Sequence, residues 1–96
     1  MSLKNTSACL GYQQITSVAA STGLTVPSDQ NVGIPTMAVI QAEAQAVRWR
    51  DDGVAPTASV GMVLAAGSSM NYDGSLGNIR FIQVTAGAIL NISYYS

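Results

Sequence analysis

The sequence predicts an all-β domain: a compact antiparallel β-sandwich or barrel, jelly-roll-like, of about seven or eight short strands. Gly and Pro recur at short intervals along the 96-residue chain, so few stretches are long enough for a helix. The segments between them are short and rich in Val, Ile, Thr and Tyr. A chain of this length holds one domain. We expect a polar, partly mobile N-terminal arm over residues 1–21 and a single β domain over residues 22–96.

Residues 37–47 are compatible with two structures. The Ala, Gln and Glu content favours a helix, as does the helical spacing of Met37, Ile40, Ala44 and Val47. The alternative is a strand over residues 37–42, a turn at 43–45 and a return strand to Arg50. We expect this hairpin, because Pro35 precedes the segment and β alternation resumes at Val47 without a stop signal.

The strand expected at residues 47–50 has one buried and one hydrated side, because Val47 and Trp49 alternate with Arg48 and Arg50. It ends at Asp51-Asp52-Gly53. Three shorter strands are expected at residues 22–26, 61–64 and 69–72.

The C-terminus predicts a hairpin. Residues 78–84 form its first strand, and residues 88–95 form its second strand, with Ala88, Leu90, Ile92 and Tyr94 on one face. Between them, Thr85-Ala86-Gly87 supplies a turn with a residue free to adopt positive φ.

The composition excludes several classes of function. Only 9% of residues are charged and the formal net charge is −1, so there is too little positive charge to bind phosphate backbones or anionic lipid. We therefore expect neither a nucleic acid nor a membrane as partner. The chain has no His, and Cys9 is its single cysteine, so a Ser-His or Cys-His nucleophile, a His-ligated metal and an intrachain disulfide cannot form. We expect no catalytic residues, no metal and no cofactor.

Two acidic motifs are better explained as turns than as sites. Asp51 and Asp52 are adjacent, and neighbouring strand residues point to opposite faces, which suits a solvated turn better than a general acid/base pair. Residues 71–74, Asn-Tyr-Asp-Gly, resemble the opening of a Ca²⁺ loop but lack its bidentate Glu, so we expect a β-turn there.

A small, nearly neutral domain gains stability from association, so we expect a homo-oligomer. Trp and Tyr are common anchors of interfaces, and Arg often accompanies them. The expected interface or anchor residues are Trp49, Arg48, Arg50, Arg80, Tyr94 and Tyr95. Tyr94 and Tyr95 lie on opposite faces of the last strand, so one could fill the core while the other meets a partner.

The segment Val-Arg-Trp-Arg-Asp-Asp-Gly at residues 47–53, with Pro56-Thr57 and Gly61-Met62 after it, resembles small virion structural proteins of tailed bacteriophages and prophages. Residues 79–82, 87–88 and 90–95 also resemble the ending of such proteins. The resemblance implies a compact β-sandwich or barrel that decorates a capsid or is repeated elsewhere in the particle, with no catalytic residues to carry over.

The expected function is therefore that of a non-enzymatic capsid decoration or cement subunit, a cyclic homo-oligomer with a trimer favoured, that binds the major capsid protein or other virion proteins. Its expected location is the virion, assembled in the cytoplasm of the bacterial host. One alternative is a connector in the tail, neck or baseplate. Another is a small glycan- or ligand-binding β module that uses Trp49 and the tyrosines.

Overall fold

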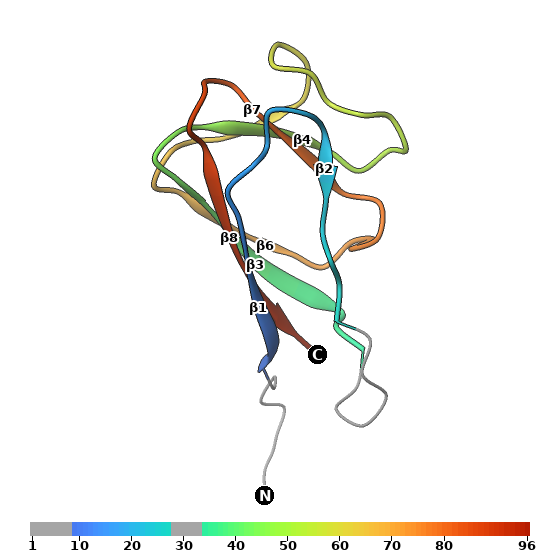
Figure 1. Ribbon diagram of the computed structural model, residues 1–96. Helices are drawn as coiled ribbons and strands as arrows, with labels where there is room; N and C mark the ends of the chain where they lie inside the picture. Colours follow the sequence, from blue (N-terminus) through green and yellow to red (C-terminus); the bar gives the residue numbers. More distant parts are fainter. Residues whose placement is uncertain (1–8, 28–33) are drawn as a thin grey trace, which may run out of the picture.

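A computed structural model describes residues 9–27 and 34–96, which form two facing antiparallel sheets (Figure 1). Sheet A has the strand order β1-β8-β3-β6, and sheet B has the order β2-β7-β4-β5. The strands are β1 (Cys9–Ile15), β2 (Thr22–Gly23), β3 (Met37–Glu43), β4 (Val47–Arg50), β5 (Met62–Leu64), β6 (Ser69–Tyr72), β7 (Arg80–Gln83) and β8 (Ile89–Tyr95). The all-β sandwich prediction is confirmed.

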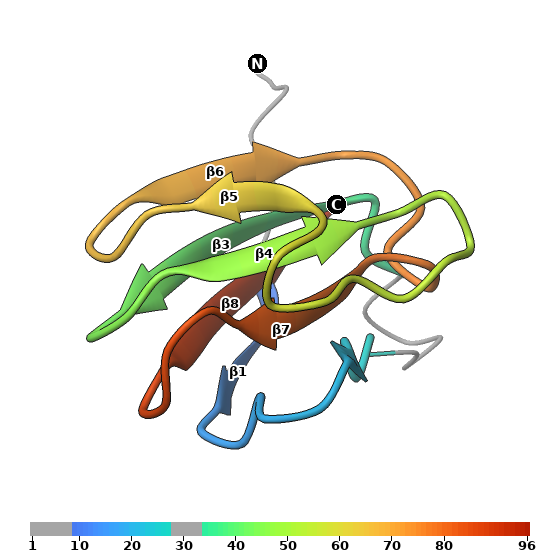
Figure 2. The same cartoon turned by 90° about the horizontal axis from the view of Figure 1, so that it is seen from above.

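The strand pairing is that of a jelly roll. The first strand pairs with the eighth, the second with the seventh, the third with the sixth and the fourth with the fifth. These four pairs are nested one inside another, as in a single long hairpin. Two further pairs, β3–β8 and β4–β7, join them into two separate four-stranded sheets. Seen from above, one sheet lies over the other, with β5 and β6 as edge strands on the same side (Figure 2).

The predicted C-terminal hairpin is wrong in its pairing. The strands β7 and β8 are consecutive, but β7 pairs with β2 and β4 whereas β8 pairs with β1 and β3. The predicted turn is present, with Gly87 at φ 97°, but it carries the chain from one sheet to the other. The crossing brings the buried faces of the two strands, with Phe81 and Leu90, into one shared core.

Residues 37–47 form a strand and a turn, not a helix. Ala38, Ile40 and Ala42 are all buried, which is the two-residue period of a strand, so tertiary packing has overridden helix propensity. The expected hairpin pairing is also wrong, because β3 belongs to sheet A and β4 to sheet B. The turn between them contains Ala44 at φ 74°, in the left-handed region.

Because Ala at positive φ is strained and Gly is not, we expect Ala44→Gly to keep the fold and not to lower stability. Strain relief of about 1–2 kcal/mol exceeds the entropy that Gly adds to the unfolded chain, about 0.4–1 kcal/mol. Chemical denaturation at neutral pH measures the net gain, expected to be up to about 1 kcal/mol. A loss of more than about 1 kcal/mol would contradict the assigned turn.

The predicted boundary of the N-terminal arm is also wrong where the structure describes it. Residues 9–15 form β1, which pairs with β8 along its length, and Ile15 and Val18 are buried in the core. Residues 1–8 of the predicted arm lie outside the described residues.

The core lies between the sheets and follows the predicted alternation of the last strand. Ala88, Leu90, Ile92 and Tyr94 are all buried, whereas the residues between them are half-buried. The other large buried side chains include Phe81, Ile40, Ile79, Val18 and Val47. In residues 9–27 and 34–96, no helix has the length and apolarity needed to cross a bilayer.

Candidate interaction surface

Sheet B brings the three predicted arginines onto its outer face. Arg48 and Arg50 alternate with the inward-facing Val47 and Trp49 of β4. On the neighbouring strand β7, Arg80 lies directly opposite Arg50 in the register. Arg50 and Arg80 therefore lie side by side on the outer face of sheet B, at the end where the 51–61 loop begins.

Arg48 holds this loop against the sheet. Its Nε donates a hydrogen bond to the carbonyl oxygen of Ala58 at 3.1 Å, and its Nη1 donates one to that of Gly61 at 2.8 Å. Gly61 adopts φ 142°, and a Cβ there would lie 3.1 Å from the Cβ of Arg48. The side chain of Arg48 thus holds the loop in place through these two hydrogen bonds, and the lack of a side chain at Gly61 lets the backbone approach it closely.

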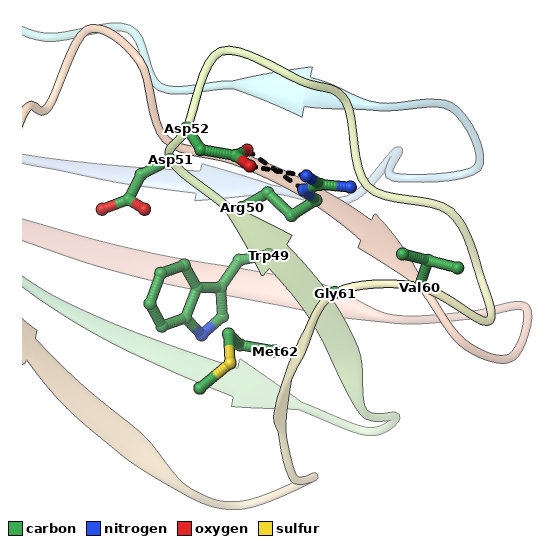
Figure 3. Close-up of a pocket in the computed structure, with 7 residues that line it drawn as sticks. All are labelled: Trp49, Arg50, Asp51, Asp52, Val60, Gly61 and Met62. Atoms are coloured by element: carbon green, nitrogen blue, oxygen red, sulfur yellow. Dashed lines mark hydrogen bonds and ion pairs between the residues drawn. The ribbon is translucent and has the colours of Figure 1, made fainter.

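The adjacent carboxylates make separate contacts. Asp52 accepts a bidentate pair of hydrogen bonds from Arg50, at 3.0 and 2.5 Å. This hydrogen bonding holds the pKa of the Asp52 carboxyl below its usual range. Asp51 points away from Asp52 (Figure 3) and accepts a hydrogen bond of 2.7 Å from the hydroxyl of Tyr72. The chain then turns at Gly53, at φ 86°, which confirms the predicted turn.

The inner face of sheet B is only partly covered at the same end. Met62 lies opposite Trp49 in the register, on the face that buries Val47 and Leu64 further along the strands. Yet the side chain of Met62 is 61% exposed. Trp49 is half-buried and packs edge-on against Tyr72, with ring centroids 6.1 Å apart. Trp49 and Met62 lie side by side (Figure 3). They line an open hollow of about 550 Å³, to whose lining Val60 and Gly61 also belong.

Exposed apolar side chains continue around this end. We call Val54, Val60, Met62 and Val63 the apolar rim; each of the four is more than half exposed. Met62 and Val63 belong to β5, which lies next to β4 at the edge of sheet B among the described strands. Such edges normally carry a charge or a Pro that discourages pairing with another chain, and β5 has neither.

The structure brings together four of the six predicted anchor residues. All four lie on sheet B near the start of the loop, with Arg48, Arg50 and Arg80 on its outer face and Trp49 on its inner face. Tyr94 is instead buried in the core, 1% exposed, where its hydroxyl donates to Oε1 of Gln13 at 2.7 Å. Tyr95 lies half-buried on the outer face of sheet A.

The residues that the sequence analysis missed are those of the apolar rim. One signal could have revealed them: no charged residue occurs between Asp52 and Asp73. In a protein so poor in charge, a long uncharged segment that includes an edge strand points to a contact surface.

Residues 71–74 end β6 and lead into a turn. Gly74 packs against the ring of Tyr72, and a Cβ there would lie 2.5 Å from the Tyr72 hydroxyl oxygen. In the part of the chain that the structure describes, no three His, Cys, Asp or Glu side chains cluster in a way that could hold a metal ion.

Comparison of the chain with models of known protein families, with curated proteins and with solved structures finds no match.

Proposed function

We propose that this protein is a non-enzymatic structural subunit of a bacteriophage particle, namely a capsid decoration or cement subunit. It forms a homo-oligomer, and its contacts with other copies or with the particle are made through sheet B. The observation that carries the proposal is the apolar rim beside Trp49, two of whose four residues belong to an edge strand without charge. Patches of exposed apolar side chains with a polar border mark protein contact surfaces. Here the border is supplied by Arg50, Asp52 and Arg80.

Two further observations support a virion role. The Arg-Trp-Arg-Asp-Asp-Gly segment, which resembles small virion proteins, forms β4 and the start of the 51–61 loop, so the resembling residues lie on the candidate surface. The jelly roll is also a common architecture of viral capsid proteins. Fold alone does not imply function, so the surface residues and not the jelly roll carry the proposal.

The energetics of such an assembly are favourable for a small domain. An interface of about 800 Å² per partner contributes on the order of 20 kcal/mol of gross apolar burial, and association costs roughly 4–15 kcal/mol. Closed cyclic symmetry repeats the same contact in each copy. A trimer or another ring would give the subunit several equal attachments to a symmetric shell.

Native mass spectrometry and co-sedimentation with phage particles test this proposal. We expect a defined oligomer that sediments with particles at a copy number on the order of hundreds, as a symmetric capsid requires. About a dozen copies or fewer would instead place the protein in the tail, neck or baseplate. A stable monomer that is absent from particles would refute the proposal.

Charge placed in the apolar rim should weaken association. We expect Met62→Asp and Val63→Asp each to lower by about 100-fold either the affinity between copies or the affinity for the particle. The reason is that an unpaired charge buried in the contact costs several kcal/mol. Val84→Asp is the matched control, since Val84 is also exposed but lies just beyond the far end of β7. Sedimentation at several concentrations measures the change, and unaltered association in both rim variants would show that the rim is not the contact.

A further inference from the structure

The outer face of sheet A differs in chemistry from that of sheet B. In the register of the four strands, the residues that project from it stand in rows across the sheet. Amides, hydroxyls and tyrosines predominate, and Glu43 is the one charged residue among them. The row members are Cys9, Tyr95 and Met37; Tyr12, Ser93, Val39 and Asn71; Gln14, Asn91, Gln41 and Ser69; and Ile89 and Glu43.

Asn91 is the centre of a hydrogen-bond network on this face. Its Oδ1 accepts from the hydroxyl of Tyr12 at 2.5 Å and from Nε2 of Gln14 at 3.0 Å. Its Nδ2 donates to Oε1 of Gln41 at 3.2 Å and to Oε1 of Glu43 at 2.8 Å. The four partners come from β1 and β3, on either side of β8. All four hydrogen-bonding positions of the Asn91 amide are thus satisfied, and three strands hold one fixed arrangement.

The network leaves hydrogen-bonding capacity that faces outward. Oε1 of Gln14 can accept, and Nε2 of Gln41 can donate, because the network uses only the other atom of each amide. Ser69 adds a hydroxyl beside Gln41. A hollow of about 270 Å³ opens beside Gln41 and Ser69, and its lining also includes Tyr12, Val39, Asn91 and Ser93.

We propose that the outer face of sheet A is a binding site for a neutral oligosaccharide. A sugar ring presents hydroxyl groups that both donate and accept, and fixed amides match both roles without the cost of desolvating a charge. Tyr12 is 63% exposed, and its ring supplies the flat apolar surface on which the C–H face of a sugar can stack. Because the network already fixes the amides, little side-chain entropy is lost on binding.

Charge distinguishes this class of ligand from others. The three arginines of the described chain lie on β4 and β7 in sheet B, so sheet A offers no cation for a phosphate or sulfate group. The site is also separate from the apolar rim, which belongs to the opposite sheet. The proposal therefore does not depend on the proposed function and can succeed or fail independently of it.

NMR titration of the full chain with neutral hexasaccharides of glucose, mannose and N-acetylglucosamine tests the site. We expect one of the three to bind with a dissociation constant of about 1 mM or tighter. The side-chain amide signals of Gln14, Gln41 and Asn91 should shift, and the indole signal of Trp49 should stay in place. Absence of binding by all three at about 10 mM would overturn the proposal, as would shifts confined to Trp49 and its neighbours.

Variants localise the contact. We expect Tyr12→Ala and Gln41→Ala each to weaken binding at least about tenfold, the effect of losing an aromatic or hydrogen-bonding anchor. Met62→Ser, on sheet B, is the control and should bind as the wild type does. Tyr12→Phe keeps the ring but loses the hydrogen bond to Asn91, so it should retain more affinity than Tyr12→Ala. Wild-type affinity in both Tyr12→Ala and Gln41→Ala would show that the sugar binds elsewhere.

Discussion

Phe81→Ala should remove much of the stability of the protein, whereas Ile82→Ala, one residue further along β7, should remove little. Phe81 is fully buried between the sheets, and Ile82 is half-buried on the outer face of sheet B. Truncation of a buried Phe costs about 3–5 kcal/mol, against a total free energy of unfolding of about 5–15 kcal/mol for a domain. We expect Ile82→Ala to cost less than half as much, because part of its surface is already hydrated.

Urea denaturation of the two variants and the wild type at neutral pH measures this difference. The comparison tests the register of β7, since a shift of one residue would exchange the two faces. Equal losses in the two variants would mean that the strand has no buried face and would contradict the sandwich. If Phe81→Ala does not fold, Phe81→Leu replaces it, with a smaller loss that should still exceed that of Ile82→Ala.

Local alternation was sufficient to predict the last strand. Ala88, Leu90, Ile92 and Tyr94 are apolar at every second position, and all four are buried. The same periodicity contains no information about partners. Both the hairpin and the observed crossing bury an apolar face of β7 and of β8, so the choice between them depends on contacts with β1 and β2, far away in the sequence.

The first strand was missed because its alternation is interrupted. The register of β1 against β8 shifts between Cys9 and Gly11, which marks a β-bulge. Gln13 also breaks the pattern, since this polar residue lies opposite the buried Ile92. Its Oε1 is satisfied by the hydroxyl of Tyr94 and by the backbone N–H of Thr25 at 3.1 Å. Only the folded structure supplies those two donors.

The candidate surface was predictable in part. Alternation places Arg48 and Arg50 on one face of β4, as the sequence indicated. The position of Arg80 opposite Arg50 required the pairing of β4 with β7, which no local pattern reports. The exposure of Met62 depends on what the facing sheet covers, which no local pattern in the strand reports.

The protein should lose stability at alkaline pH through two buried tyrosines. Burial raises the pKa of Tyr72 to about 12, and its hydrogen bond to the Asp51 carboxylate acts in the same direction. Burial alone raises the pKa of Tyr94 to about 12. In the unfolded chain a tyrosine has a pKa of about 10, so the unfolded state releases protons that the folded state retains. This contribution to stability is fully present below pH about 10 and is lost as the pH rises toward about 12.

Each tyrosine should account for a loss on the order of 2 kcal/mol across this interval. The measurement is the free energy of unfolding of wild type, Tyr72→Phe, Tyr94→Phe and the double variant, at several pH values from 7 to about 12. Each Phe variant should start about 1 kcal/mol lower at neutral pH, because it loses a hydrogen bond. Each should then decline less steeply above pH about 10, and the double variant least of all. Four curves that fall in parallel would show that neither phenol is held in its neutral form by the fold.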